Sequence, residues 1–250
     1  MWEQGIKMRV HTKFYFLLTL VTIVFTLFMY SIGVVILGAA IFPGAYFLYQ
    51  LWVHTVYLSV ALRILYFCFG FVGGYFISGV MLMLLVGLVS IVFRLKLKEG
   101  EFGVGSLEIF KWVFVNAFFM VVKVVFLDLI LLTPYCALFY RMMGAKIGTN
   151  VLINSKNVGD LSLLEIGDNS AIGGSATIIA HSFEKGGLKL QKVKIGKEVI
   201  IGLNAVIFPG VEIGDRAMIA AGAVVPKNTH VAANTTYWGA THPMSRNPPH

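Results

Sequence analysis

The fold of this chain is decided by residues 195–213, which read IGKEVIIGLNAVIFPGVEI. An aliphatic residue stands at every sixth position of this stretch and of the residues after it. The series comprises Ile195, Ile201, Ile207, Ile213, Ile219, Val225 and Val231. Small or branched residues recur four places further on, at Val199, Ala205, Val211, Ala217 and Ala223. A period of six is neither a strand nor a helix period and is typical of a parallel β-helix, in which each hexad forms one short strand and one turn.

The same period begins earlier in the chain. Its earlier members are Ile147, Ile153, Ile166, Ile172 and Ile178. If three hexads close one triangular coil, successive coils begin at Ile147, Ile166, Ile195 and Ile213. The step from Ile178 to Ile195 carries eleven residues more than a hexad. We therefore expect an extruded loop that contains Phe183 to Lys192.

The residues before the repeat have the composition of a membrane protein. The chain is 58% hydrophobic and 13% charged, with a mean hydropathy of +0.81, far from the usual values of soluble domains. Residues 14–42 and 64–93 contain no charge, and each exceeds the ~20 residues that a helix needs to cross a bilayer. We expect spans at about 14–42 and 68–93, with an interfacial or re-entrant segment at 44–66 that carries Gln50 and His54.

Positive charges favour one orientation of these spans. Basic clusters flank the two spans at Lys7, Arg9 and Lys13 and at Arg94, Lys96 and Lys98. The positive-inside rule places both clusters in the cytoplasm, which requires an even number of crossings between them.

Residues 112–140 are interrupted by Lys123, Asp128 and Pro134. Charges inside a span are costly, so an interfacial amphipathic hairpin is favoured over a third crossing. The alternative is that Lys123 and Asp128 form an ion pair inside a helical bundle. The hairpin keeps the β-helix on the cytoplasmic side. The expected domains are a membrane domain at 1–143, the β-helix at 144–240 and a tail at 241–250.

The formal net charge of +8 arises mostly at the expected membrane borders. Anionic lipid head groups account for that bias, and no strip of interleaved aromatic and basic residues indicates nucleic-acid binding. Cys68 and Cys136 both lie in apolar segments, so neither a disulfide framework nor a metal site is expected.

His181 precedes the expected loop and is the candidate general base. A neutral imidazole can remove a proton from a hydroxyl or amine as that group attacks an acyl carbon. Such a base usually needs a carboxylate to orient it. The candidates are Asp160, Glu165 and Glu184. Asp160 is preferred because it occupies the equivalent face one coil earlier; the alternative is that His181 only fills a coil corner and the carboxylates are solvated turn residues.

Several motifs resemble those of the hexapeptide-repeat acyltransferases over residues 144 to about 240. They are Gly144-Ala-Lys-Ile-Gly148, Leu161-Ser-Leu-Leu-Glu-Ile-Gly167, the His181 loop and Trp238-Gly239. They look most like the membrane-bound C-terminal units of poly-lysine synthetase and related nonribosomal peptide synthetases, whose linker is similar to residues 94–112. The resemblance implies a left-handed parallel β-helix, a homotrimer with active sites between subunits, and a general-base role for His181.

The resemblance also implies a donor site in the glycine-rich coil at residues 219–227. In that family the backbone of this coil lines the pantetheine arm of coenzyme A. The residues concerned here are Ala221, Gly222, Pro226 and Lys227, with Lys227 near the nucleotide phosphates. The alternative is that every coil needs small residues there and Lys227 is a solvated turn residue. Family members commonly end with Trp-x-Gly-x-Pro-Ala, whereas residues 237–243 read YWGATHP, so the donor could instead be a carrier-bound thioester or an aminoacyl adenylate.

The sequence therefore predicts an integral membrane acyltransferase that transfers an activated acyl or aminoacyl group to a hydroxyl or amino acceptor. Membrane lipids and a lipid-linked or membrane-delivered acceptor are the expected partners. The rival interpretation is a non-catalytic trimeric membrane scaffold that keeps the fold. The zinc carbonic anhydrases of this fold bind metal through three histidines, but His181, His230, His242 and His250 lack that spacing; no metal is expected.

Overall fold

The computed structural model describes the backbone of residues 2–239 and the side chains of residue 16 and residues 18–239. The expected tail at 241–250, the histidines in it and the basic cluster at residues 7–13 lie outside these described side chains. Residues up to Leu82 and residues from Met83 onward form two compact units. The expected domain boundary at 143 therefore lies within the second unit, so residues 83–143 group with the coils.

The first unit contains the long helix α1 (Trp2–His54) and the first part of α2 (Val60–Val92), whose residues from Met83 onward belong to the second unit. Helix α1 runs through Pro43 without a break, so the segment expected as a separate piece at 44–66 instead comprises the end of α1, a turn and the start of α2. The polar side chains that suggested an interruption bond within α1. Gln50 Nε2 donates to the Tyr46 hydroxyl at 2.5 Å, and His54 Nδ1 lies 2.8 Å from the Gln50 carbonyl oxygen.

Small residues bring α1 and α2 into close contact. A Cβ atom added to Gly44 would lie 2.3 Å from the Gly74 carbonyl oxygen, and one added to Gly70 would lie 2.3 Å from the Leu51 side chain. Glycine is required at Gly44 because the two backbones approach more closely there than a larger residue allows.

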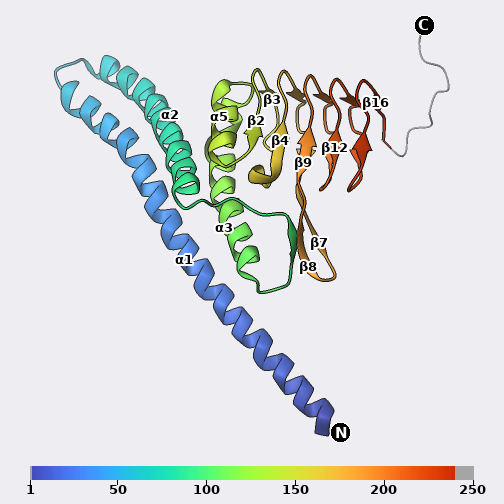
Figure 1. Cartoon of the computed structure of the whole chain (residues 1–250). Coiled ribbons are helices and arrows are strands. Elements are labelled where there is room, and N and C mark those ends of the chain that lie inside the picture. The colour runs from blue at the N-terminus through green and yellow to red at the C-terminus, as the bar shows by residue number, and fades with distance from the viewer. Residues whose placement is uncertain (1, 240–250) are drawn as a thin grey trace. The chain divides into compact units, whose positions relative to one another are not determined.

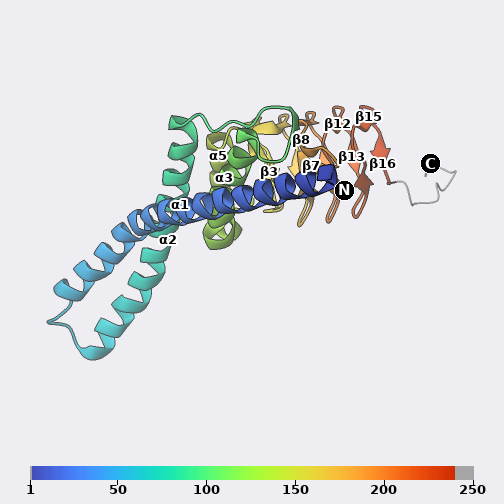
Figure 2. The same cartoon turned by 90° about the horizontal axis from the view of Figure 1, so that it is seen from below.

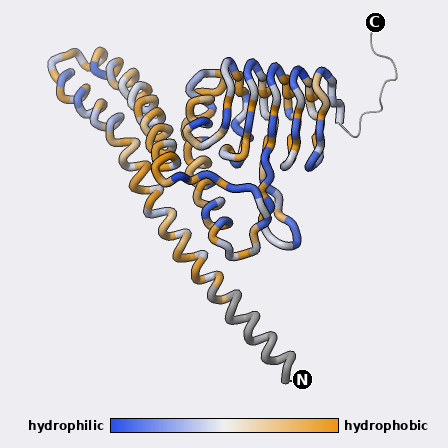
Figure 3. Tube along the Cα trace, viewed as in Figure 1, coloured by the Kyte–Doolittle hydropathy of each residue, from blue (hydrophilic) through white to orange (hydrophobic). Residues whose placement is uncertain are grey.

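Three helical segments are long and apolar enough to cross a membrane by length and composition. They are Leu18–His54, Val60–Val92 and Leu107–Ile130, with mean hydropathies of 2.5, 2.4 and 2.3. The third lies where the sequence favours an interfacial hairpin. Figure 3 shows the apolar colouring of these helices and the alternating polar and apolar colouring of the coils.

The C-terminal coils form a three-sided parallel β-helix, and Figures 1 and 2 show them stacked in a row from β2 to β16. One face contains β2 (Lys146–Ile147), β4 (Leu164–Ile166), β9 (Val193–Ile195), β12 (Glu212–Ile213) and β15 (His230–Val231). The second contains β3 (Leu152–Ile153), β5 (Ala171–Ile172), β10 (Ile200–Ile201), β13 (Met218–Ile219) and β16 (Thr236–Tyr237). The third contains β6 (Thr177–Ile178), β11 (Val206–Ile207) and β14 (Val224–Val225).

The pairing register confirms the predicted coils. Ile166 pairs with Ile147 on one side and Ile195 on the other, and Ile195 pairs with Ile213. Every aliphatic residue of the six-residue series is buried. Corners between faces are tight: Asn204 adopts a φ of 55°, and a Cβ atom on Gly202 would lie 2.5 Å from the Ala221 nitrogen. Asparagine suits position 204 because it tolerates the left-handed backbone. Glycine suits position 202 because the backbone of the next coil leaves no room for a Cβ atom.

Helices from the same unit cover the first coil. They are α3 (Leu107–Val122), the π-helical turn η1 (Lys123–Leu127), α4 (Asp128–Ile130) and α5 (Pro134–Met142). The Leu132 nitrogen donates to the Ile153 carbonyl at 2.9 Å, and the Tyr140 hydroxyl donates to the Ser155 carbonyl at 3.2 Å. These bonds and the buried apolar faces of α3 and α5 shield the first coil from solvent, as the open end of a repeat array requires.

Candidate active site

The predicted extruded loop is an antiparallel hairpin of β7 (His181–Glu184) and β8 (Gly187–Leu190). Its outer strand pairs with β1 (Gly100–Phe102), which comes from the linker before α3. Gly187 makes this pairing possible, because a Cβ atom there would lie 2.2 Å from the Phe102 carbonyl oxygen and its φ is +131°. Figure 1 shows the hairpin leaving the coils with β1 alongside it.

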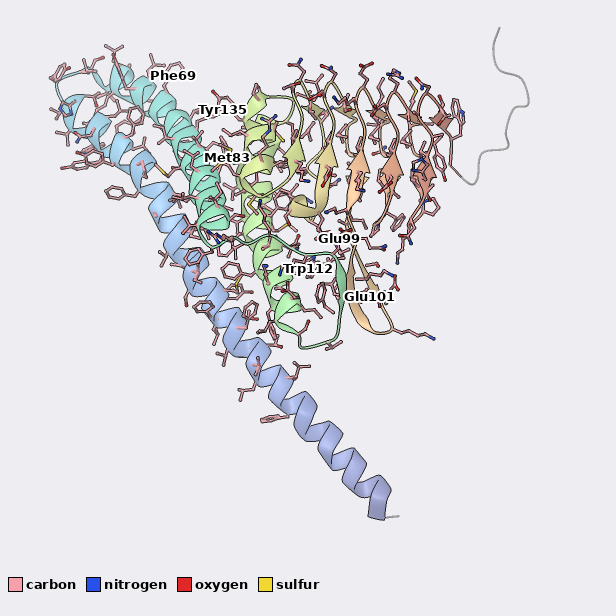
Figure 4. The ribbon with its side chains drawn as sticks, in the orientation of Figure 1. Phe69, Met83, Glu99, Glu101, Trp112 and Tyr135 are labelled. Atoms are coloured by element: carbon pink, nitrogen blue, oxygen red, sulfur yellow. The ribbon has the colours of Figure 1, made fainter. Side chains whose placement is uncertain are left out.

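Acidic residues of the linker strengthen its attachment to the hairpin. Glu101 forms an ion pair with Lys189 at 2.8 Å, and Glu99 accepts a hydrogen bond from the Lys192 nitrogen at 2.9 Å. That bond lowers the pKa of the Glu99 carboxyl below its ordinary value. Both glutamates are labelled in Figure 4 beside the hairpin.

His181 contacts the buried carboxylate of Asp160. Its Nδ1 lies 2.5 Å from Asp160 Oδ2, and the Asp160 side chain has no exposed area while that of His181 is 27% exposed. An ionised carboxylate can only accept a hydrogen bond, so in the neutral imidazole Nδ1 is the donor to Asp160 and Nε2 is left as the acceptor. The Asp160 carboxylate thus holds the imidazole in one orientation.

The coil geometry explains why Asp160 reaches His181. Val158 bridges to Ile178 in the next coil, and the Ala180 nitrogen donates to Asp160 Oδ2 at 3.0 Å. Asp160 has a φ of 52° and precedes the short 3-10 turn η2 (Leu161–Leu163). This left-handed backbone, which aspartate tolerates better than most residues, directs the side chain inward at the corner where the hairpin starts.

The other two candidate carboxylates do not hydrogen bond to His181 in the described structure. Glu184 accepts from Lys227 Nζ at 2.9 Å and from the Ser182 hydroxyl at 3.1 Å. Glu165 pairs with Lys146 at 2.8 Å on the first face of the β-helix. Among the three, only Asp160 is in place to orient the imidazole.

The predicted donor residues divide between two corners of the fourth coil. Ala221 and Gly222 are exposed at the corner between β13 and β14. Pro226 and Lys227 are exposed at the next corner, where Lys227 contacts Glu184 of the hairpin. The structure thus brings Lys227 to the hairpin and leaves Ala221 and Gly222 one coil face away.

Two polar residues of α3 also contact Asp160, and the sequence analysis missed both. Trp112 Nε1 donates to Asp160 Oδ1 at 2.7 Å, and Asn116 Nδ2 lies 3.4 Å from the same oxygen. The Trp112 ring meets His181 and Phe183 edge-on, with centroids 4.9 and 5.5 Å away. Figure 4 shows Trp112 between α3 and the hairpin. The available signal was a lone amide four residues after a tryptophan, in a stretch of α3 that is otherwise apolar from Trp112 to Val122.

A groove of about 640 Å³ lies elsewhere on the β-helix. It crosses the face formed by β2, β4, β9 and β12, and no residue of the hairpin lines it. Its charged side chains pair with one another, as Lys194 does with Glu212 at 2.7 Å. His230 also lines the groove, exposed and with its Nδ1 4.0 Å from Glu212 Oε2, whereas His181 lies outside it on the hairpin.

No three His, Cys, Asp or Glu side chains gather into a possible metal site within the described residues. Burial raises the pKa of the Cys136 thiol to about 12, so this side chain stays protonated.

Comparison with known proteins identifies relatives of the repeat. Residues 192–227 match the family described as the hexapeptide repeat of succinyl-transferase. The chain is 38% identical over 90 residues to YvoF of Bacillus subtilis (strain 168), named as a candidate acetyltransferase; the match covers 36% of this chain and 52% of YvoF. It is 23% identical over 115 residues to the delta-poly-L-ornithine synthetase of Acinetobacter baumannii (strain AB307-0294), covering 46% of this chain and 9% of the synthetase.

A solved structure of a hexapeptide-repeat acetyltransferase from Vibrio cholerae, complexed with acetyl coenzyme A, is also similar. It is 22% identical with a TM-score of 0.44, and the match covers 58% of this chain and 91% of that chain. The chain spans about half the length of YvoF and much less of the synthetase. The resemblance to the hexapeptide-repeat acyltransferase superfamily, including the poly-amino-acid synthetases, is confirmed by the family match and these relatives.

Proposed function

We propose that this chain, which carries the hexapeptide repeat of the acyltransferase superfamily, is a membrane-integrated acyltransferase with His181 as its general base. It transfers an activated acyl or aminoacyl group to a hydroxyl or amino acceptor. The observation that carries this proposal is the contact of His181 Nδ1 with the buried Asp160 carboxylate, which leaves Nε2 as a proton acceptor.

The proposed reaction starts when an acceptor hydroxyl or amine lies against Nε2. As Nε2 takes its proton, the acceptor oxygen or nitrogen attacks the acyl carbon and forms a tetrahedral intermediate. Backbone amides of a neighbouring coil stabilise the negative oxygen. The intermediate collapses, the bond to the donor sulfur breaks, and the imidazolium returns the proton to the departing thiolate. Asp160 stabilises the positive charge that His181 carries between these steps.

The proposed donor is an acyl coenzyme A or another pantetheine-linked or adenylate-activated group. The names of the matched relatives support acyl transfer. Ala221, Gly222 and Pro226 offer exposed backbone for a pantetheine arm, and Lys227 offers a cation for phosphate. Lys227 forms an ion pair with Glu184, so on phosphate binding the phosphate would replace the Glu184 carboxylate as the partner of Lys227.

The membrane part of the proposal rests on the first two candidate spans, Leu18–His54 and Val60–Val92, which return the chain to the cytoplasmic side before α3. It includes a β-helix on the cytoplasmic side and an acceptor that is lipid-linked or delivered at the membrane. A homotrimer, with the His181 site closed by a neighbouring subunit, completes the proposal by analogy with the superfamily. Chemical cross-linking of the purified full chain tests the trimer independently of activity.

The test uses the full chain in lipid nanodiscs, acetyl coenzyme A labelled in the acetyl group, and membrane extract as the source of acceptors. We expect His181→Ala to lower transfer by about 10²–10⁴-fold, the usual contribution of a general base. His230→Ala is the matched control, because this exposed histidine lies on the last coil and its loss should leave transfer unchanged. Equal transfer by His181→Ala and wild type would exclude the proposed base. Absence of donor consumption by the wild type would favour the scaffold interpretation.

A further inference from the structure

The carboxylate of Asp160 is held by donors on both oxygens, and they come from two parts of the chain. Oδ2 faces the Ala180 nitrogen and His181 Nδ1, both at the corner where the hairpin leaves the repeat. Oδ1 faces Trp112 Nε1 and Asn116 Nδ2, both from α3. The repeat alone therefore satisfies only one oxygen of this carboxylate.

The Asp160 side chain is fully buried, so water does not replace a missing donor. A buried charged oxygen without a partner is costly, and a carboxylate with donors on one oxygen only can rotate to share them. Donors on Oδ1 oppose that rotation and keep Oδ2 directed at the imidazole. The indole N–H, at 2.7 Å, supplies the shorter of the two contacts.

The indole ring restrains the imidazole directly as well. It packs edge-on against His181, with the ring planes at 63°, and against Phe183 at 82°. Aromatic pairs favour this edge-to-face arrangement. Trp112 thus contacts both members of the pair, one through its N–H group and the other through its ring.

Asn116 has a second bond that fixes its side chain. Its Nδ2 donates to the Trp112 carbonyl at 2.9 Å, one helical turn earlier. Two residues spaced by four on a helix lie on one face, so α3 presents the indole and the amide together to Asp160.

We propose that Trp112, assisted by Asn116, is a positioning residue that orients Asp160 and thereby His181. This inference rests on the proposed general-base function. It makes α3, which begins the apolar segment Leu107–Ile130, a structural part of the active site in addition to any role as an anchor. The repeat and its hairpin are incomplete for catalysis without α3.

The kinetic test uses Trp112→Phe, which keeps an aromatic ring and removes the N–H donor, and Asn116→Leu. We expect kcat to fall about 10-fold for Trp112→Phe and less for Asn116→Leu, because a hydrogen bond to a charged group contributes about that factor. KM for acetyl coenzyme A should stay within about twofold, since neither side chain is assigned to donor binding. Met120→Ala is the control, because Met120 is an exposed residue of the same helix.

A double-mutant cycle separates positioning from general stability. In the Asp160→Asn background the carboxylate is absent, so adding Trp112→Phe should lower kcat by less than about twofold. If Trp112→Phe lowers kcat by the same factor in the wild-type and Asp160→Asn backgrounds, Trp112 acts independently of Asp160 and the inference is overturned.

A substrate-free measurement covers the same point. Nitrogen-15 NMR of histidine-labelled protein reports which imidazole nitrogen carries the proton, with the His181 signal assigned by its loss in His181→Ala. We expect one tautomer, protonated at Nδ1, in the wild type and in Met120→Ala, and a tautomer mixture in the Trp112→Phe, Asn116→Leu double variant. A single unchanged tautomer in that double variant, together with wild-type kcat, would refute positioning by α3. The proposed function fails separately if His181→Ala keeps wild-type transfer.

Discussion

Two corners of the β-helix occupy the same place in coils that are separated by the coil of β11, and they differ completely. After β14, residues 226–229 turn the chain directly into β15. After β6, the chain instead forms the hairpin of β7 and β8 before entering β9. The backbone of the direct corner forms hydrogen bonds within the repeat; for example, the Asn228 nitrogen donates to the Pro209 carbonyl oxygen at 3.1 Å.

The interrupted corner needs partners from outside the repeat. Strand β1 pairs with the hairpin, and α3 supplies two donors to Asp160. Regular corners thus stabilise the coil, whereas the interrupted corner carries a buried charge and an exposed imidazole edge. Stability should therefore depend on the regular positions and activity on the interrupted corner.

The largest effect on stability is expected inside a regular coil. Ile207 is fully buried and pairs with Ile178 and Val225 on the third face. Ile207→Ala should lower the free energy of unfolding by about 2–5 kcal/mol, because it removes buried methyl groups and leaves a cavity. Urea unfolding followed by circular dichroism measures the change. Leu203→Ala, at a side chain 56% exposed, is the control; equal losses in both variants would contradict a core confined to the hexad positions.

A smaller and more local effect is expected where β1 meets the hairpin. Gly187→Ala introduces a Cβ atom 2.2 Å from the Phe102 carbonyl oxygen at a φ of +131°, which should cost about 1–3 kcal/mol in backbone strain and separate β1 from β8. Hydrogen exchange of the amides in residues 100–102 and 187–190 should accelerate.

Gly186→Ala is a matched control for this variant, because nothing lies within 4 Å of a Cβ atom placed there. Unchanged exchange in Gly187→Ala, or equal acceleration in both variants, would show that the linker strand does not depend on this glycine.

The smallest effect is expected for the ion pair that joins the hairpin to the direct corner. The hydrogen bond from Lys227, followed by that from Ser182, lowers the pKa of the Glu184 carboxyl. A carboxyl with a lowered pKa adds stability above its unfolded pKa, near 4.3, and loses it as pH falls through the folded pKa. In Lys227→Met, Tm should therefore fall less steeply than in the wild type as the pH is lowered from about 5 to about 3.

The control for this titration is Lys185→Met, at an exposed lysine of the hairpin turn. Because Glu184 is exposed, solvent screens the pair and the difference between the two variants should be small. If Tm falls as steeply on acidification in Lys227→Met as in Lys185→Met, the Lys227–Glu184 ion pair does not contribute to stability.

Much of the fold was predictable because the repeat encodes itself locally. Each isoleucine of the series faces the interior for the same steric reason, so the coil starts at Ile166 and Ile195 follow from spacing alone. The helix boundaries were less predictable. Gln50 and His54 indicated an interruption, yet their side chains form hydrogen bonds within the helix. The composition of the segment does not reveal such hydrogen bonds.

The candidate site was predictable in part for the same reason. His181 stands at the interruption, and Asp160 lies one coil earlier, so stacking brings the two together. The contribution of α3 was not predictable, since Trp112 is 48 residues from Asp160 in the chain and no repeat relates them.

By itself, the sequence determined the three-sided coil, the position of its interruption and the apolar character of the helices, because periodicity and composition act through neighbours along the chain. Only the tertiary structure decided which lysine meets Glu184 and that an apolar helix completes the Asp160 environment. A buried carboxylate needs hydrogen-bond donors, and these come from segments far apart in the sequence that only the packed chain brings together.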